Sequence, residues 1–158
     1  MTETYDITII GAGPVGLFTT FYAGMREAKV HLIDSMQEVG GQLSALYPEK
    51  YIYDIAGLKK IKAKDLVDQL YDQALTFSPK ITLGESVLDV HRLDEETFEV
   101  ITTANRYLTR TIIITAGAGA FKARKLAVPN SEKYENSNLH YSIKSLDDFY
   151  DENVLICG

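Results

Sequence analysis

Residues 5–34 read YDITIIGAGPVGLFTTFYAGMREAKVHLID. They contain two short apolar runs, and between these runs lie a glycine-rich turn and a segment whose apolar residues recur at helical spacing. The first run, residues 5–10, is short and rich in β-branched residues, as in a parallel strand buried on both faces. Pro14 suits the first turn of a helix, and the apolar residues after it recur at helical spacing. Residues 29–33 form the next apolar run, which ends at Asp34. The stretch therefore predicts a strand, a helix and a parallel strand joined by a right-handed crossover.

The turn between the first strand and the helix, GAGPVG at 11–16, has the spacing of a dinucleotide-binding fingerprint. Gly11 permits the tight turn, Gly13 lets the backbone approach a diphosphate, and Gly16 lets the helix pack closely on the sheet. The diphosphate is expected at the positive N-terminus of the helix, where backbone N–H groups lack partners. Asp34 lies eighteen residues after Gly16, where its carboxylate can accept both ribose hydroxyls and would repel a 2′-phosphate. The alternative, a glycine-rich turn beside a solvated aspartate, is disfavoured by the complete strand–turn–helix–strand context.

Composition sets broad limits on the protein. A chain of 158 residues with 46% hydrophobic and 24% charged residues is typical of one globular domain plus a remnant. The net charge of −6 argues against nucleic acid as the main partner, because phosphate binding requires clustered cations. We expect a cytoplasmic protein with no membrane segment, because the sequence shows no long apolar run and no leader pattern. The single cysteine, Cys157, excludes an intramolecular disulfide, and we expect it to be buried.

The remainder of the chain predicts one further helix and several short strands. The helix is expected over residues 63–76, before Pro79. The strands that follow are separated by polar turns and form an antiparallel meander added to the parallel sheet. We also expect a polar connection after residue 120 and a buried strand over residues 154–158. The four strands after the helix are expected at 81–83, 86–91, 98–103 and 107–114.

The fingerprint alone does not distinguish FAD from NAD, and three other features resemble flavoproteins of the glutathione reductase superfamily. GGQL at 40–43 follows the second strand, the meander at 86–114 is similar to the small sheet inserted in those proteins, and TIIITAG at 111–117 resembles their second FAD motif. The resemblance implies an α/β fold, a three-layer, Rossmann-like FAD/NAD(P)-binding domain with a parallel sheet and an inserted antiparallel meander.

The superfamily mostly sends electrons through a cysteine pair in one of two places, and both places lack cysteine here. They read GGQLSALYPEKYIYD at 40–54 and NLHYSIKSLDDF at 138–149. A flavin without a dithiol must pass its electrons directly to an outside acceptor. These stretches, together with TAGAGAFKARKL at 115–126, resemble the thioredoxin-reductase-like ferredoxin–NADP reductases of bacteria over essentially the whole chain.

This resemblance assigns individual roles around an FAD cofactor. Asp34 would bind the ribose, Gln42 would lie near the flavin, and the Val87 backbone would contact the adenine. Tyr47 would stack on the isoalloxazine ring, which suits a redox ring because stacking fixes its plane, and Phe121 would border the cofactor. Without the resemblance, Tyr47 reads as a core tyrosine. We assign no catalytic or metal-binding residue, and the expected cofactor set is Gly11, Gly13, Pro14, Gly16, Asp34, Gly41, Gln42, Tyr47, Val87, Gly117 and Phe121.

The resemblance also implies an activity and a domain plan. NADPH would reduce the flavin, and the flavin would release single electrons to ferredoxin or flavodoxin. Residues 1–118 would form the N-terminal part of the FAD-binding domain, and 119–158 a connector and the first strand of a truncated NADPH-binding domain. We expect a homodimer at full length, and we expect the 158-residue chain itself to be inactive and to bind FAD weakly or only by its ADP end.

Three points stay open. One alternative is a thioredoxin-reductase-like NAD(P)H flavoenzyme with another acceptor, and a second is a non-catalytic module that binds an adenine nucleotide. Two basic clusters, at 59–64 and 122–125, would suit docking of an acidic partner but read equally well as solvated charges.

Overall fold

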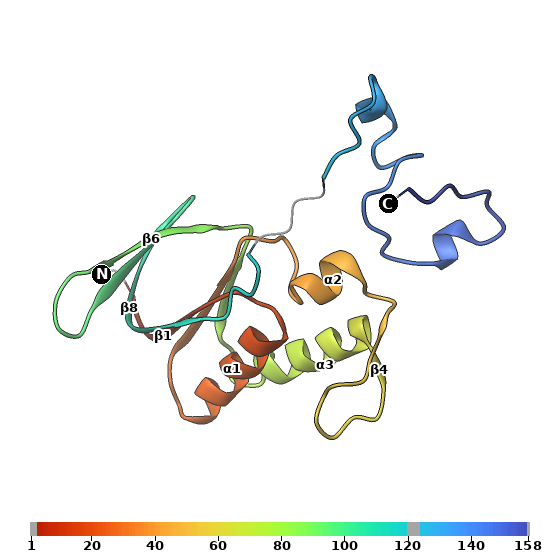
Figure 1. Cartoon of the computed structure of the whole chain (residues 1–158). Helices are drawn as coiled ribbons and strands as arrows, with labels where there is room; N and C mark the ends of the chain where they lie inside the picture. The colour runs from red at the N-terminus through yellow and green to blue at the C-terminus, as the bar shows by residue number, and fades with distance from the viewer. Residues whose placement is uncertain (1–2, 120–123, 158) are drawn as a thin grey trace.

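The structure is a computed structural model that describes residues 3–119 and 124–157. Its centre is a six-stranded sheet with the order β5-β2-β1-β8-β7-β6 (Figure 1). The first four strands in this order are parallel, and β8, β7 and β6 pair as an antiparallel meander. The predicted α/β fold with its inserted meander is therefore confirmed. The strands of this sheet are β1 (Thr4–Ile10), β2 (Val30–Asp34), β5 (Lys80–Leu83), β6 (Val87–Arg92), β7 (Phe98–Thr102) and β8 (Arg106–Ile114).

Two helices, α1 (Pro14–Met25) and α3 (Ala63–Leu75), pack together on one face of the sheet (Figure 1). The core between the helices and the sheet includes Ile9, Leu17 and Leu32, all fully buried. Burial of each such side chain stabilises the fold by about 1.5–3 kcal/mol. The periodic apolar residues that predict α3 face the core, where Leu66, Val67 and Ala74 are buried. The apolar face that predicts α1 (Val15, Leu17, Phe18, Phe21 and Tyr22) is wrong except for Leu17, because α1 packs through Gly16, Leu17, Thr20, Ala23 and Gly24 and leaves Val15, Phe18 and Tyr22 exposed.

The meander supplies a layer on the other face of the sheet. Val30 and Leu32 of β2 lie in the core beneath the helices, so strand alternation directs His31 to the opposite side. There the His31 ring lies edge-on to Tyr107 of β8, with 4.4 Å between ring centroids. It also lies 4.6 Å from the ring of Tyr5. The long strand β8 therefore pairs with β1 over residues 108–114 and with β7 over residues 106–109, and its Tyr107 covers His31.

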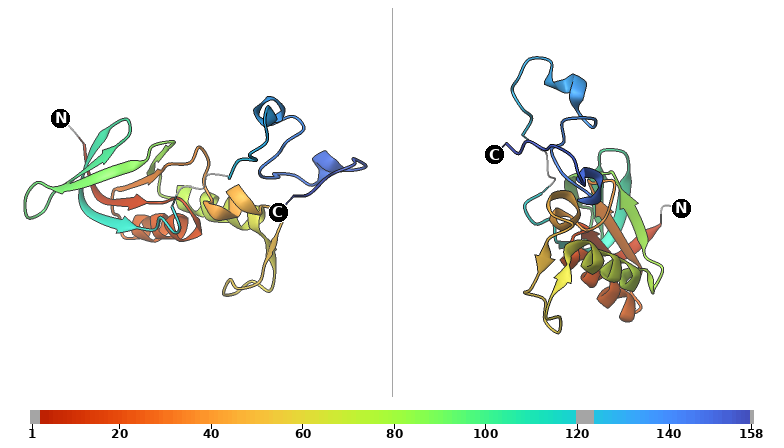
Figure 2. Two further views of the ribbon diagram at one scale, coloured as in Figure 1. Left: turned by 45° about the horizontal axis from the view of Figure 1, so that its top comes forward. Right: turned by 90° about the vertical axis from the view of Figure 1, so that its right-hand side faces the viewer.

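The glycine- and tyrosine-rich sequence of residues 40–62 predicts a loop. The structure instead contains a short helix and a hairpin there. A short helix, α2 (Gln42–Leu46), begins after Gly41, whose φ of 56° belongs to the left-handed region. A two-stranded antiparallel hairpin, β3 (Tyr51–Ile52) and β4 (Ile61–Lys62), then leads directly into α3. Figure 2 shows this hairpin projecting from the end of α3.

The C-terminal segment differs from its predicted structure. Residues 124–157 lie apart from the sheet (Figure 2) and contain two short 3-10 helices, η1 (Ser131–Tyr134) and η2 (Asp147–Phe149). The strand predicted over 154–158 is wrong for the described residues 154–157, where Leu155 and Ile156 are 86% and 88% exposed. Cys157 is exposed rather than buried. An apolar run becomes a buried strand only when neighbouring strands pair with it, and none does so within residues 124–157.

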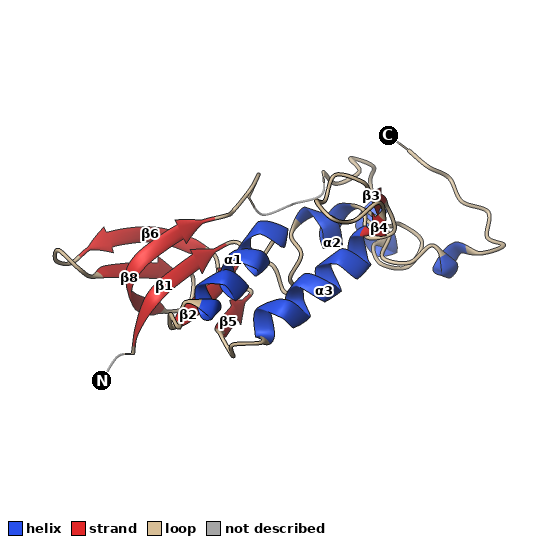
Figure 3. Cartoon of the chain, turned by 90° about the horizontal axis from the view of Figure 1, so that it is seen from below, coloured by secondary structure: helices blue, strands red, loops and turns tan. Residues whose placement is uncertain are grey.

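Figure 3 shows the helices of the chain, of which α1 and α3 are the longest described. Within residues 3–119 and 124–157, none combines the length and apolar character required to cross a lipid bilayer.

Candidate nucleotide-binding site

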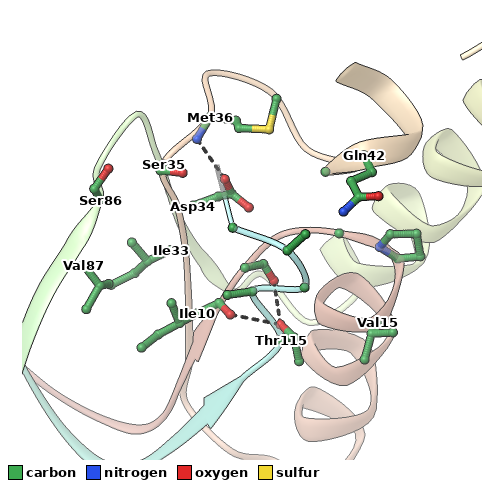
Figure 4. A pocket seen from close by; sticks show the side chains of 18 of the residues that line it. Ile10, Val15, Ile33, Asp34, Ser35, Met36, Gln42, Ser86, Val87 and Thr115 are labelled. Carbon is green, nitrogen blue, oxygen red and sulfur yellow. Dashed lines mark hydrogen bonds between the residues drawn. The ribbon is translucent and has the colours of Figure 1, made fainter. Parts of the chain in front are cut away.

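A pocket of about 470 Å³ opens where β1, β2 and β8 end (Figure 4). Ligands of parallel α/β sheets bind at this edge, outside the carboxyl ends of the strands. The walls come from five places in the sequence: the glycine turn, the loop after β2, the start of α2, the segment that precedes β6 and the segment that follows β8. One ligand in this pocket would therefore contact segments next to β1, β2, β6 and β8.

The glycines of the turn are required for three different reasons. Gly11 has a φ of 109°, and a Cβ on it would lie 2.6 Å from the carbonyl oxygen of Thr115. A Cβ on Gly16 would lie 1.8 Å from the carbonyl oxygen of Gly11, so only glycine lets α1 approach the turn. A Cβ on Gly13 would meet no atom within 4 Å, and Gly13 lines the pocket. The fold therefore requires glycine at 11 and 16, whereas at 13 glycine keeps space open for a ligand.

The N-terminus of α1 points free donors at the pocket. Gly13 caps the helix without any side-chain hydrogen bond, and Pro14 occupies the first turn. The backbone N–H groups of Val15 and Gly16 lie too early in the helix to have intrahelical partners. Together with the positive end of the helix dipole, they favour an anion such as a diphosphate.

Asp34 ties the glycine turn to the loop after β2. Its Oδ2 accepts a 2.6 Å hydrogen bond from the backbone N–H of Ala12. Its Oδ1 accepts a 2.8 Å hydrogen bond from the N–H of Met36 (Figure 4). Each carboxylate oxygen has a second lone pair that can accept a hydroxyl. The side chain is thus held in place while it keeps acceptor capacity for a sugar at the pocket edge.

Thr115 closes the turn from the side of β8. Its Oγ1 lies 3.1 Å from the carbonyl oxygen of Ile10 and 2.8 Å from that of Gly11, and its hydroxyl is the donor. The N–H of Thr115 also donates to the carbonyl of Ile10, at 2.8 Å. The segment after β8 is therefore bonded directly to the nucleotide turn.

Glu85 lies in the segment just before β6, which forms one wall of the pocket, and its hydrogen bonds hold this wall in place. Its carboxylate accepts hydrogen bonds from Thr102 Oγ1 at 2.6 Å, Asn105 Nδ2 at 2.8 Å and the Tyr107 hydroxyl at 3.1 Å. Burial acts to raise the pKa of Glu85, but these donors outweigh it, and the pKa lies below its usual value. The N–H of Glu85 donates to the Asp34 carbonyl at 3.1 Å, so this wall is linked to the ribose side as well.

The structure gathers most, but not all, of the residues expected to hold a cofactor. Gly16 lies behind the turn, in the packing role expected of it, and Tyr47 follows α2 without lining the pocket. Phe121 lies outside the described residues. The expected residues that do line the pocket are Gly11, Gly13, Pro14, Asp34, Gly41, Gln42, Val87 and Gly117.

Other lining residues were not anticipated from the sequence. Thr115 belongs to the quoted TIIITAG motif, which provides a signal for it, whereas Glu85 has none because its role depends on partners from β7 and β8. The unanticipated lining residues are Ile10, Val15, Ile33, Ser35, Met36, Leu43, Glu85, Ser86, Thr115, Ala116, Ala118 and Gly119. In the part of the chain that the structure describes, no cluster of His, Cys, Asp and Glu side chains is arranged to hold a metal ion.

Comparison with known proteins agrees with this geometry. Residues 41–158 match the family described as pyridine nucleotide-disulphide oxidoreductase. The chain is 53% identical over 156 residues to "Ferredoxin–NADP reductase 2" of Shouchella clausii and to "Ferredoxin–NADP reductase" of Halalkalibacterium halodurans. Each match covers 99% of this chain and 47% of the relative, so the chain spans about half the length of these curated relatives.

Solved structures show the same fold. The thioredoxin reductase of Streptococcus pyogenes MGAS5005 superposes with a TM-score of 0.66 and 26% identity, covering 85% of this chain and 41% of that protein. The thioredoxin reductase of T. acidophilum gives a TM-score of 0.63 and 25% identity, covering 85% of this chain and 41% of that protein. The family match covers most of the chain and includes β3 to β8. The chain belongs to the pyridine nucleotide-disulphide oxidoreductase family.

Proposed function

We propose that this chain is the FAD-binding portion of a reductase that passes electrons from NADPH to ferredoxin or flavodoxin without a redox dithiol. The observation that carries the proposal is the pocket in which Asp34 is bonded to the glycine turn in front of the α1 N-terminus. Relatives named ferredoxin–NADP reductase, at 53% identity, support the choice of reaction.

Different residues of the pocket would bind different parts of the FAD molecule. Asp34 would accept the ribose hydroxyls, the backbone at Val87 would meet the adenine, and the α1 N-terminus would hold the diphosphate. When bound, FAD supplies a ring that is reduced by two electrons and can release them singly. The remaining proposed contacts are Gly11, Gly13, Pro14, Gly41, Gln42 and Gly117 around the diphosphate and flavin ends, with Gly16 packed behind the turn.

Tyr47 and Phe121 complete the proposed flavin site. Tyr47 follows the C-terminus of α2, and the N-terminus of α2 lines the pocket with Gly41 and Gln42. An aromatic ring at this position would shield one face of the redox ring and leave an edge open for electron transfer. Replacing Tyr47 with leucine is expected to shift the visible flavin spectrum of the bound cofactor and to leave ADP affinity unchanged.

The wider activity belongs to the whole protein. NADPH would serve as the electron source, residues 119–158 would connect to and begin an NADPH-binding domain, and the complete enzyme would be a cytoplasmic homodimer. We propose that the 158-residue chain by itself retains FAD weakly and does not turn over NADPH.

The visible spectrum of the purified chain tests the proposal. Titration with FAD and with ADP should give saturable binding at one site, and bound FAD should be lost on gel filtration. No binding of either nucleotide would overturn the assignment of the pocket. Strong retention of flavin, or NADPH-driven reduction of an artificial acceptor, would refute the proposed inactivity of the chain.

A thioredoxin-reductase-like flavoenzyme with another acceptor is the second candidate, and the structural similarity to the S. pyogenes thioredoxin reductase favours it. The argument against it is that the chain has a single cysteine, Cys157, and therefore no cysteine pair to act as a redox dithiol. Assays of the full-length protein with ferredoxin and with thioredoxin side by side would separate the two. Tight binding of ADP with no affinity for FAD would instead indicate a non-catalytic nucleotide-binding module.

A further inference from the structure

The β3–β4 hairpin carries a positive charge on an acidic protein. Residues 47–64 contain five lysines against two carboxylates, Glu49 and Asp54, whereas the whole chain has a net charge of −6. Figures 1 and 2 show the hairpin projecting beyond the helices, away from the six-stranded sheet. The positive charge therefore lies on a projecting hairpin that another molecule can reach.

The ion pairs of the hairpin divide its lysines into two groups. Glu49 accepts hydrogen bonds from Lys62 at 2.9 Å and from Lys64 at 2.6 Å, so these two lysines at the base of the hairpin share one carboxylate. No carboxylate among the described residues forms an ion pair with Lys50, Lys59 or Lys60. The hairpin thus has lysines paired with a carboxylate at its base, and exposed lysines without an ion pair in its outer part.

Aromatic and apolar side chains lie among these lysines. Tyr51 and Tyr53 are 42% and 65% exposed, and Leu58 is also exposed. The Lys60 Nζ lies 3.6 Å from the centre of the Tyr51 ring. Exposed tyrosines supply contact area at low entropic cost, and flanking charges steer a partner of the opposite sign. We define the hairpin patch as Lys50, Tyr51, Tyr53, Leu58, Lys59 and Lys60.

The hairpin patch begins beside the position proposed for the flavin ring. The backbone N–H of Lys50 donates to the Tyr47 carbonyl at 3.0 Å, and the Lys50 Nζ lies 5.3 Å from the Tyr47 ring centre. A carrier that receives single electrons must approach the edge of the redox ring closely. A partner seated on the hairpin patch would be held on this side of the protein.

We propose that the hairpin patch is the docking surface for an acidic electron-carrier protein of the ferredoxin type. Its lysines attract the carboxylates of the carrier, and its tyrosines provide the apolar contact once the carrier has arrived. This inference rests on the proposed function, because it names the surface on which the acceptor of that reaction binds.

Binding of an acidic bacterial ferredoxin to this chain tests the proposal by isothermal titration calorimetry at 50 mM and 500 mM NaCl. Lys59→Glu with Lys60→Glu should weaken binding about tenfold at low salt, since each exposed charge contact contributes up to about 1 kcal/mol. The difference should shrink at high salt, because screening shortens the range of surface charges. Lys59→Gln with Lys60→Gln should have a smaller effect in the same direction.

Lys80→Glu with Lys133→Glu is the matched control, because it makes the same change in net charge outside the hairpin at two exposed lysines that form no ion pair with a described carboxylate. It should alter binding less than twofold. Equal weakening by both double variants, or no ferredoxin binding by a chain that still binds FAD or ADP, overturns the docking surface and leaves the proposed nucleotide site intact. If the unmodified chain binds neither FAD nor ADP, the proposed function itself is refuted.

Discussion

The Oδ2 atom of Asp34 accepts a 2.6 Å hydrogen bond from the backbone N–H of Ala12. This bond joins the end of β2 to the turn after β1, and the N–H of Met36 fixes the other carboxylate oxygen. One side chain thus positions the turn and, in the proposed function, the ribose. Substitutions at Asp34 should affect the nucleotide site through both of these roles.

Asp34→Asn should lower the affinity for ADP about tenfold, because it replaces charge-assisted hydrogen bonds with neutral ones. It should also reduce discrimination against ADP that carries a 2′-phosphate, because the repelling charge is gone. Calorimetric titration with both nucleotides measures the two effects. Asp54→Asn, in the exposed hairpin, serves as the control. An unchanged preference between the nucleotides would remove Asp34 from the ribose site.

Gly13→Ala and Gly16→Ala should separate binding from folding. The first places a methyl group in open space at the pocket, so the melting temperature should stay within about 2 °C while ADP binding falls at least tenfold. The second forces a Cβ to within 1.8 Å of the Gly11 carbonyl oxygen, so unfolding should become easier by several kcal/mol. Thermal melts and ADP titrations of both variants check this. Equal destabilisation by both substitutions would contradict the distinct roles of the two glycines.

His31 should make the protein less stable in mild acid. Burial, with a further contribution from Lys80, lowers the pKa of His31 from 6.5 to about 4. Between these values the unfolded chain binds a proton that the folded protein does not, so stability is highest above pH 6.5 and decreases as the pH falls toward 4. The loss is roughly 3 kcal/mol. Urea unfolding across this range measures it, and His31→Gln should flatten the profile. A profile with the same slope in the variant would assign the acid sensitivity to other groups.

Glu85→Ala should destabilise the meander, because Thr102, Asn105 and Tyr107 all lose their shared acceptor. We expect a decrease of about 1–3 kcal/mol in the free energy of unfolding. Hydrogen exchange of the amides in β6 and β7 should accelerate. Glu95→Ala, in the exposed turn of the meander, should leave both measurements unchanged. Equal stability of the two variants would show that the hydrogen bonds of Glu85 contribute nothing measurable.

The elements of the main sheet were predictable because each has a local signal. Residues 5–34 show the periodicities of a strand, a helix and a strand, and the structure places β1 and β2 within one residue of the predicted positions and starts α1 at Pro14. The meander was predictable for the same reason, since polar turns separate its apolar runs. A segment adopts the secondary structure that its sequence pattern predicts when a neighbouring segment packs against its apolar residues.

The remaining differences arise where structure depends on distant partners. The α2 helix and the β3–β4 hairpin lie in a stretch whose glycines and tyrosines signal a loop, although backbone bonds such as Ala63 N–H to the Lys50 carbonyl, at 2.8 Å, organise it. Glu85 appeared unremarkable in sequence because its three donors come from β7, β8 and the turn between them. Residues 154–157 have strand-like sequence, but no other described segment pairs with them.

The bond from the Thr115 hydroxyl to the Ile10 carbonyl spans 105 positions. During translation, the ribosome therefore releases β1, α1 and β2 long before the residue that anchors their turn has been made. We expect nascent chains that end before Thr115 to be captured poorly by immobilised ADP, and capture to rise once residue 115 has left the exit tunnel. Early capture of shorter chains would show that the first βαβ unit forms its binding turn unaided. If the expectation holds, co-translational folding of this nucleotide-binding turn is delayed until β8 and Thr115 have emerged.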